Sequence, residues 1–499
     1  MSETSPRLSF REKSGYAFGD AAANLAFQTM LYYQLTFYTD ALGIAAGAAG
    51  TLLFAARFFD AVFDPVIGVL ADRTQTRWGK FRPWVLGTAI PFGLMFWLAF
   101  RSPHFGASGK LVYAYVTYIG LMMLYSASNT PYSALNAVMT GDNEDRTSLS
   151  SFRFVAAMTA SLVVQSFTLP MVTKFGHGDK AAGWSIVVGA YAVIAAVFLV
   201  ITFLSARERI KPAQVSKFSE DVKDLIRNGP WLAIFGVTLF MFTMLALRGG
   251  SLYYYFTYFA DRGSEFDYLR SWGFALKTDP LRGIGSHLME FIGLRLAPDH
   301  GNASDVIQWL FNLTGSLVTL LGVFASRPLA SRFGRKAVFL AGMVATTAVT
   351  ALFVLVGPKS VGTMFLFTIL WPACYGPTVP LLWVMIADVV DFSEWKTGRR
   401  ATGFAYAGIV FALKAALGLG GWIQGKVLDF YHYVPNAVQE SHALEGIRLS
   451  ATVYPAVPFA LAALCAAIYP LSKARTLQIS NDLEARRRQG GAAAATTAG

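Results

Sequence analysis

Cysteine and histidine are scarce in this chain. Its two cysteines, Cys374 and Cys465, both fall in apolar segments of the 499-residue sequence, a placement that argues against a disulfide framework or a thiolate metal site. The six histidines fall in expected loops and form no ligand cluster, which argues against histidine–metal chemistry inside the apolar segments. No segment matches the complete glycine-lysine phosphate loop of ATPases, so ATP is not indicated as an energy source.

Charge is also sparse. Charged residues make up 14% of the chain and hydrophobic residues 54%, with a mean hydropathy of +0.45. A single water-soluble core cannot bury that much apolar surface, so the composition indicates a polytopic membrane protein. The net charge of +12 does not indicate nucleic-acid binding, because the basic residues cluster in short loops between apolar segments. The first apolar run continues to Tyr38, which predicts a first span rather than a removable signal.

Apolar segments recur at the length of about 20 residues that crosses the roughly 30 Å of hydrocarbon in a bilayer. We predict twelve spans, at 15–40, 45–71, 84–101, 110–139, 151–173, 184–205, 231–260, 306–327, 337–356, 361–388, 401–426 and 449–471. Because the number is even, both termini lie on one side, and the loops richest in Lys and Arg lie with them. We therefore predict that this side is cytoplasmic.

Two of the basic loops resemble each other. Arg77-Trp78-Gly79-Lys80 follows the second span and Arg332-Phe333-Gly334-Arg335 follows the eighth, which indicates a six-plus-six repeat. The predicted organisation is an N-terminal half (1–205), a cytoplasmic central loop (206–229), a C-terminal half (230–472) and a cytoplasmic tail (473–499). This all-α plan with 12 transmembrane helices in two six-helix halves is similar to the major facilitator superfamily, whose halves rock about a midplane site.

An insert at 261–304 separates the seventh and eighth spans and is predicted to be extracytoplasmic. Its segments FDYLRSWGFALK and SHLMEFIGLRLA have the pattern of short amphipathic helices. Two interpretations stay open, a lid over an outer vestibule and an inert surface excursion, and the second is favoured.

Apart from charges at the first or last residue of a span, the predicted spans contain seven charged side chains. A charge near the bilayer centre costs roughly 2.5 to 3.5 kcal/mol, and such residues usually face an interior path. The seven are Asp20, Arg57, Asp60, Asp64, Arg153, Arg248 and Lys414. Asp60 and Asp64 share one helix face with Arg57 and offer two hard oxygen donors for a monovalent cation or a shared proton. An alternative is a structural ion pair of Arg57 with Asp60. That pair leaves Asp64 without a partner, and a buried carboxylate must then titrate or find a cation.

The other charges lie in spans that are far apart in the sequence. Asp20, Arg153 and Lys414 form one network if their spans converge on a central cavity. Lys414 lies in the middle of its span, which argues against snorkelling to the interface, whereas Arg153 lies close enough to a predicted loop for snorkelling to remain open. Arg248 receives no role.

Several segments carry a more specific resemblance. The stretches DAVFDPVIG, RWGKFRPW, GYAFGDAAANLAF, YSASNTPYSAL and ADVVDFSEWKTGRRATGFAYAG are similar to the glycoside-pentoside-hexuronide:cation symporter family, typified by the melibiose permease. The resemblance covers nearly the whole chain except the insert and the tail. It implies that Asp60 and Asp64, assisted by Ser126, bind Na⁺, Li⁺ or H⁺.

The same resemblance implies a sugar site. Asp20 and Arg153 correspond to residues that hydrogen-bond the sugar, and Lys414 to the lysine that links the cation and sugar sites. Tyr125 is retained, but Asn129 stands where the melibiose permease has a second sugar-binding aspartate. An amide still donates and accepts hydrogen bonds to hydroxyls, so a sugar is expected but galactoside specificity is not.

The predicted function is secondary active transport, in which Na⁺ or H⁺ drives symport of a sugar or glycoside. A lysolipid carrier of the same architecture and a nontransporting sugar sensor are the alternatives. We predict no enzyme, since no nucleophile–base pair is present, and no cofactor besides the coupling cation. The expected partners are the sugar and the bilayer, and we expect a monomer in a bacterial inner membrane.

Overall fold

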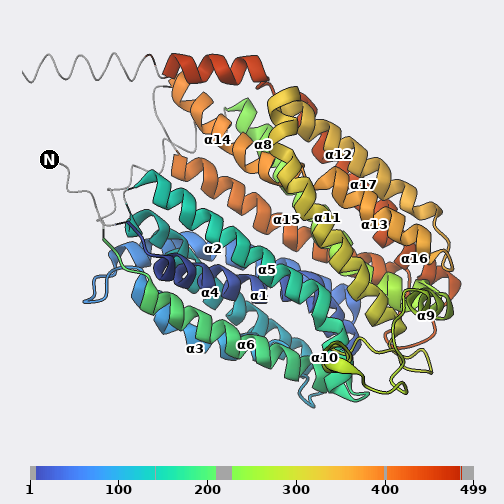
Figure 1. The fold of residues 1–499 in the computed structure, drawn as a ribbon. Coiled ribbons are helices and arrows are strands. Elements are labelled where there is room, and N and C mark those ends of the chain that lie inside the picture. Colours follow the sequence, from blue (N-terminus) through green and yellow to red (C-terminus); the bar gives the residue numbers. More distant parts are fainter. Residues whose placement is uncertain (1–6, 141, 210–227, 398–401, 484, 486–499) are drawn as a thin grey trace, which may run out of the picture.

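The computed structural model describes residues 7–140, 142–209, 228–397, 402–483 and 485. Most of the predicted central loop (206–229) and the end of the predicted tail (473–499) lie outside these residues. All regular elements of the described residues are helices, apart from isolated bridges. Figure 1 shows them as one elongated bundle, with the blue-to-green helices along one flank and the yellow-to-red helices along the other.

Each of the twelve predicted spans overlaps a helix or two consecutive helices. The first six spans correspond to α1 (Phe10–Thr36) with η1 (Phe37–Ala41), α2 (Ala46–Arg73), α3 (Arg82–Leu98), α4 (Ala107–Met139), α5 (Asn143–Gly176) and α6 (Lys180–Ser205). The other six correspond to α8 (Gly229–Tyr254) with η2 (Tyr255–Phe259), α11 (Ala303–Phe333), α12 (Arg335–Leu352) with η3 (Phe353–Leu355), α13 (Val361–Tyr375) with α14 (Thr378–Thr397), α15 (Thr402–Phe430), and α16 (Ser441–Ala451) with α17 (Val453–Ile468). Among the described residues, nine helical segments are long and apolar enough to cross a membrane, from Ala107 onward.

The helices pack as two groups that meet along three seams. In the first group α1 packs on α5 and α6, and α3 packs on α4 and α6; in the second, α8 packs on α15 and α17, and α12 on α17 and α13. The seams between the groups join α2 to α15, α5 to α11, and α1 to α8. Each group has its own hydrophobic cluster, one drawn mostly from residues 8–206 and the other from residues 231–483.

Glycine residues allow the backbones of α2 and α15 to approach closely at their seam, which we call the glycine seam. A Cβ atom placed on Gly425 of α15 would lie 2.5 Å from the carbonyl oxygen of Ala46 on α2, and one on Gly418 would lie 2.9 Å from Cβ of Arg57. Small residues let helix backbones approach closely in a membrane. The charged face of α2 is therefore held directly against α15.

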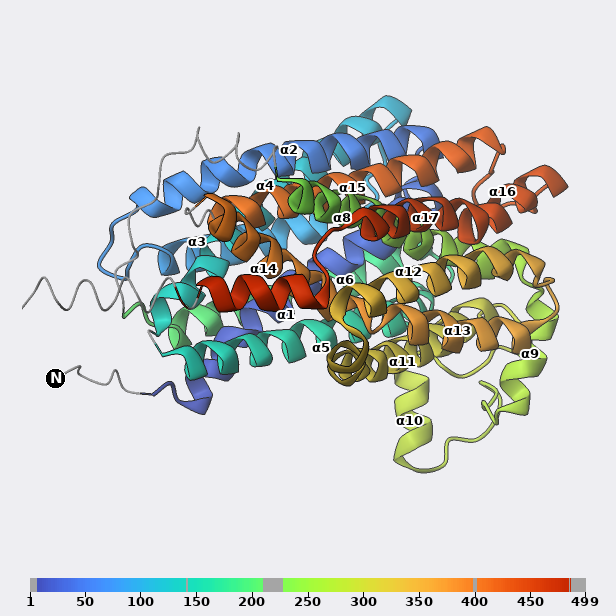
Figure 2. The same cartoon turned by 90° about the horizontal axis from the view of Figure 1, so that it is seen from above.

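The two ends of the bundle differ in what they carry. The start of α1 and residues 473–483 lie at one end, which we call the terminal side (Figure 2). The insert lies at the opposite end, which we call the insert side. It contains the short helices α9 (Arg262–Ser271) and α10 (Gly283–Phe291). Helix α10 projects sideways from the bundle in Figure 2 and is seen nearly end-on in Figure 1.

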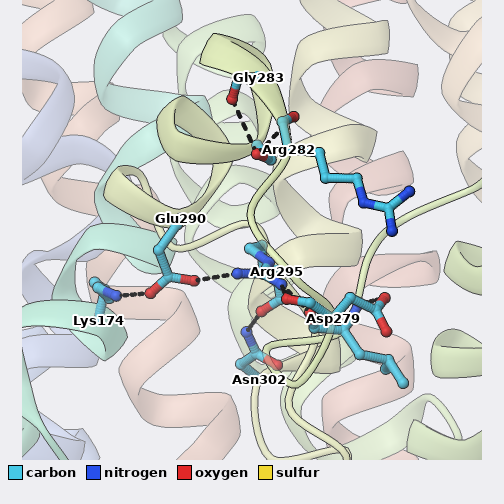
Figure 3. A network of polar contacts seen from close by, with 9 residues as sticks. Lys174, Asp279, Arg282, Gly283, Glu290, Arg295 and Asn302 are labelled. Atoms are coloured by element: carbon cyan, nitrogen blue, oxygen red, sulfur yellow. Dashed lines mark hydrogen bonds and ion pairs between the residues drawn. The ribbon is translucent and has the colours of Figure 1, made fainter.

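A polar network fastens the insert to α5 (Figure 3). Glu290 of α10 pairs with Lys174 of α5, and its second oxygen lies 3.6 Å from Arg295 Nη1. Arg295 Nη2 donates to the carbonyl oxygen of Leu276 at 2.6 Å, and Asn302 Nδ2 donates to that of Arg295 at 2.8 Å. The insert follows a helix of the second group but contacts the first group, so it is a strap between the two.

Candidate functional site

The centre of the α2–α15 seam holds a cluster of charges. Lys414 Nζ lies 2.9 Å from Asp60 Oδ2 and 2.5 Å from Asp64 Oδ2. Ser126 Oγ of α4 donates to Asp60 Oδ1 at 2.5 Å and lies 3.4 Å from Lys414 Nζ. Asp60 is only 1% exposed. The structure thus brings the three residues predicted to bind a cation into contact with the lysine predicted to link the two sites.

The alternative of a structural ion pair between Arg57 and Asp60, which leaves Asp64 without a partner, is wrong. Both carboxylates instead lie against Lys414. No ion pair joins Arg57 to an acid within the described residues, and its guanidinium carbon lies 5.5 Å from the centre of the Phe27 ring. The glycine seam explains the difference, because it brings a lysine of the second group within reach of α2. One carboxylate oxygen, Asp64 Oδ1, is still buried without a hydrogen-bond partner.

A second charged pair lies within the first group of helices. Arg153 of α5 pairs through Nε with Asp20 of α1, and its Nη2 donates to Asp20 Oδ1 at 3.3 Å. The guanidinium carbon lies 5.1 Å from the centre of the Tyr132 ring and 5.7 Å from that of Tyr16. Arg153 therefore points into the helix group and does not snorkel.

The other two predicted substrate residues, Tyr125 and Asn129, do not line a large cavity. Tyr125 and Asn129 line a void of only about 10 Å³ together with Gly19 and Phe92. Tyr125 packs on Phe27, with the ring centres 6.3 Å apart. The predicted sugar-binding residues thus lie on neighbouring helices, but the structure does not gather them around one cavity.

The large cavity lies between the two groups. Its volume is about 970 Å³, and it is lined mainly by α1, α5, α8, α11 and α13. Most lining side chains are apolar, and the polar ones include Gln28, Tyr32, Gln165, Arg248 and Asn312. Leu417, one turn beyond Lys414 on α15, also lines it, so the charged cluster and the cavity share a helix.

Sequence reasoning missed most of this cavity wall. Arg248 was noted without a role, and Gln28, Gln165 and Asn312 were not singled out. The available signal was a strongly polar side chain in the middle of an otherwise apolar span. Burying an amide without a hydrogen-bond partner costs free energy, as burying a hydroxyl does.

The cavity is closed toward the insert side. Asp40 of η1 accepts hydrogen bonds from Tyr258 at 2.7 Å, Tyr433 at 2.7 Å and Tyr253 at 3.1 Å, all from the second group. Thr173 of α5 donates to Asp305 of α11 at 2.5 Å. These bonds cross between the groups at the end where the insert lies.

Comparison with known proteins places the chain. The family model described as MFS/sugar transport protein matches residues 15–286 and 301–473. The chain belongs to this family. The predicted resemblance to glycoside-pentoside-hexuronide:cation symporters and the predicted fold class are confirmed, and the protein is an integral membrane transporter of the major facilitator superfamily, not an enzyme.

Relatives match along almost the whole chain. The inner membrane symporter YicJ of Escherichia coli K12 is 33% identical over 471 residues, which are 93% of this chain and 92% of the relative. The putative glycoside/cation symporter YagG of the same organism is 32% identical over 482 residues, 96% of this chain and 95% of the relative. Among solved structures, the nucleoside transporter NupG superposes with a TM-score of 0.60 at 14% identity, covering 92% of this chain and 98% of that one. That last likeness concerns the fold alone.

Proposed function

We propose that this transporter couples the entry of Na⁺ or H⁺ to symport of a sugar or glycoside. We further propose that it lies in a bacterial inner membrane with both termini in the cytoplasm. The similarity to YagG, a putative glycoside/cation symporter, supports the class of substrate. The charged cluster on the α2–α15 seam supports the coupling to a cation.

One observation carries the proposal, namely that a single lysine is shared by two carboxylates. Lys414 contacts both Asp60 and Asp64, so one positive charge faces two negative ones, and Asp64 Oδ1 has no hydrogen-bond partner. A buried carboxylate without full compensation is stabilised by a cation or a proton. Two carboxylates and the Ser126 hydroxyl offer the oxygen donors that a hard cation prefers.

The lysine couples the cation to the substrate in this scheme. A cation at Asp60 and Asp64 repels the Lys414 ammonium and weakens its hold on both carboxylates. Because Lys414 belongs to α15, which also lines the cavity through Leu417, its release changes the wall that the substrate contacts. Binding of the cation then increases the affinity for the substrate. By thermodynamic linkage, binding of the substrate increases the affinity for the cation by the same factor.

The energy available is sufficient for accumulation. One positive charge moving inward gains about 2.3 kcal/mol per 100 mV of membrane potential. At about 1.4 kcal/mol per factor of ten, a neutral sugar carried with one cation reaches on the order of 50-fold accumulation before any cation gradient is counted.

Uptake into proteoliposomes tests the proposal. We expect Asp60→Asn and Asp64→Asn each to abolish accumulation driven by a Na⁺ or pH gradient, while the amount of folded protein stays near that of the wild type. Asp388→Asn is the matched control, because Asp388 pairs with Arg335 on the terminal side, away from the cluster. Loss of folded protein in the two cluster variants would instead indicate a structural ion pair. Uptake that ignores both gradients in the wild type would indicate a sensor.

An amphiphile is the second candidate substrate. Large apolar side chains dominate the cavity wall and would contact the apolar part of such a molecule. Among them are Leu31, Phe154, Phe242, Leu245 and Phe324. Counterflow separates the two candidates. Saturable lysolipid exchange that sugars do not affect would replace the glycoside assignment.

A further inference from the structure

Helix α10 of the insert carries an exposed apolar face. Ile284 is 89% exposed, Leu288 56% and Phe291 60%, and no residue of α10 is buried. At 3.6 residues per turn, these three side chains lie along one side of the helix. Apolar side chains gathered in this way mark a surface that meets something other than water.

The insert holds α10 beside the end of a membrane span. Glu290 pairs with Lys174 in the last turn of α5. Gly293 follows α10 and approaches α5 so closely that a Cβ atom on it would clash with the carbonyl oxygen of Pro170. Pro170 lies six residues before the end of α5 at Gly176, which is about 9 Å along the helix axis. The insert therefore contacts the side of this span and not only its tip.

The length of α5 converts this contact into a depth in the bilayer. Its 34 residues extend over about 51 Å, whereas the hydrocarbon is about 30 Å thick. If the helix extends equally beyond both faces of the hydrocarbon, each overhang is about 10 Å. That length is close to the distance between Pro170 and the end of α5. Helix α10 is thus attached at the boundary between the acyl chains and the headgroups.

The direction of α10 agrees with this boundary. The helix is seen nearly end-on in Figure 1 and projects sideways in Figure 2, so its axis runs across the length of the bundle and along the plane of the membrane. A lid would lie across the end of the bundle instead. The Phe291 ring lies 6.0 Å from the ring of Phe175 on α5, measured between their centres, which joins one end of the apolar face to the side of the span.

We propose that α10 is an interfacial helix that lies in the leaflet on the insert side, with Ile284 and Leu288 among the first carbons of the acyl chains. Interfacial helices lie in the plane of the membrane and bury their apolar face by roughly 5 to 10 Å. The depth of the contact with α5 and the direction of α10 both match this arrangement. The inference goes beyond the proposed function, because it does not depend on which substrate or cation is carried.

Arg282 supplies a contact to the headgroups. It lies directly before α10 and is exposed, and Figure 3 shows no contact of its guanidinium with the residues drawn. The nearby carboxylate of Glu290 is already shared by Lys174 and Arg295. A guanidinium binds a phosphate through two parallel hydrogen bonds. The partner of this surface is therefore the bilayer itself, with an anionic phospholipid beside Arg282.

Quenching of a fluorescent label tests the position of α10 in the full-length protein. In a background with Cys374 and Cys465 replaced by serine, the protein carries one NBD label at Leu288→Cys. Ser286→Cys, on the opposite side of α10, is the matched control. The labelled proteins are reconstituted into vesicles of phosphatidylcholine and phosphatidylglycerol in equal parts. We expect nitroxides on the acyl chains to quench the label at 288 more strongly than the label at 286, and aqueous iodide to quench them in the reverse order.

A second measurement tests the headgroup contact. The nitroxide is placed on either phosphatidylglycerol or phosphatidylcholine, and quenching of the label at 288 gives the relative binding of the two lipids beside α10. We expect phosphatidylglycerol to be preferred by about 5-fold, which corresponds to about 1 kcal/mol for one arginine near the surface. Arg282→Gln should abolish this preference. Arg101→Gln removes the same charge just beyond α3, where the guanidinium carbon lies 4.8 Å from the centre of the Trp97 ring, and should leave the preference unchanged.

Several outcomes would overturn the inference. Iodide quenching at Leu288 as strong as at Ser286 would show that the apolar face meets water. Protection of Leu288 from both quenchers would show that protein covers this face, as in a dimer of two copies of the chain. Equal quenching by the two lipids in the wild type, or a preference that survives Arg282→Gln, would contradict the contact of Arg282 with a phosphate. If the labelled Leu288→Cys protein does not fold, Ile284→Cys reports on the same face.

Discussion

The insert side and the terminal side of the bundle are held together in different ways. On the insert side, polar bonds cross from one helix group to the other, through Asp40 with its tyrosines and through Thr173 with Asp305. On the terminal side, ion pairs join residues of the same group. Examples are Lys13–Asp145 at 2.8 Å, Arg209–Glu12 at 2.5 Å and Arg335–Asp388 at 2.5 Å. The insert-side bonds indicate that the two groups are closed against each other at that end.

The difference also shows which bonds must break during the transport cycle. Bonds within a group move with that group and survive rocking, whereas bonds between groups must break whenever the insert side opens. Hydrogen bonds to a charged group contribute about 1.5 to 3 kcal/mol each, and Asp40 accepts several of them in a buried position. The cycle must supply that energy through binding of cation and substrate.

The largest expected effect comes from making the insert-side contact permanent. Thr173 Oγ1 and Asp305 Oδ2 lie 2.5 Å apart, so cysteines at both positions can be joined by a short bifunctional thiol reagent. In a background with Cys374 and Cys465 replaced by serine, we expect the cross-linked double variant to lose transport by about 100-fold or more, because the closed state can no longer exchange with the open one. With a reagent whose spacer contains a disulfide, reduction should restore transport. The two single-cysteine variants are the controls, and undiminished uptake after complete cross-linking would contradict closure at this side.

Weakening the same side should give the next largest effect. Asp40→Asn removes the charge that Tyr258 and Tyr433 bond, which favours opening by roughly 10- to 100-fold at about 1.4 kcal/mol per factor of ten. A cysteine at Ser316, which lines the cavity, reports the change through labelling by a membrane-impermeant thiol reagent added on the insert side. Asp145→Asn, on the terminal side, should leave that labelling unchanged. Equal labelling rates in the two variants would contradict the conclusion that Asp40 holds the insert side closed.

Much of this architecture was predictable from the sequence, and the reason is physical. Span length and the placement of basic loops follow from the bilayer itself, so every predicted span overlaps helices of the structure. The shared face of Asp60 and Asp64 follows from 3.6 residues per turn. Both predictions concern one helix and its solvent, and neither needs knowledge of a neighbour.

Contacts between helices were less predictable. Periodicity orients Asp64 on α2 but does not say that Lys414 of α15 stands opposite, so the sequence does not predict this ion pair. The signal was present in Gly418 and Gly425, which permit the close approach of α15 to α2, but spacing of small residues does not name the partner helix. The insert-side tyrosines were missed for the same reason, since their acceptor lies more than 200 residues away.

Protonation of one buried carboxyl should affect the stability of the insert side. Burial raises the pKa of Glu265, on α9, from its ordinary value of 4.5 to about 8, although Ser304 donates to it at 2.7 Å. The folded protein then holds a proton that the unfolded chain releases above pH 4.5. Stability is therefore fully present below that pH and is lost progressively as the pH rises toward 8, by at most about 1.4 kcal/mol per pH unit.

The variant Glu265→Gln isolates this effect, because the amide keeps the shape and cannot ionise. We expect its melting temperature to exceed that of the wild type at pH 8 and to approach it at pH 5. Arg262, Asp261 and Asp305 also act on this carboxyl and are left in place in both proteins. A difference in melting temperature that does not change with pH would show that Glu265 is ionised in the fold.

The smallest effect is expected from the strap in Figure 3, and its size depends on which partner is removed. Lys174 and Glu290 are 27% and 28% exposed, and an ion pair so accessible to water contributes only about 0 to 1 kcal/mol. Lys174→Gln leaves Glu290 with Arg295 at 3.6 Å, so we expect uptake and melting temperature close to those of the wild type. Glu290→Gln removes the charge opposite Arg295, which is only 4% exposed and then has carbonyl oxygens as its remaining partners. It should therefore lower the melting temperature more than Lys174→Gln does. The reverse order would show that the bond between the groups, rather than the internal order of the insert, is what the network stabilises.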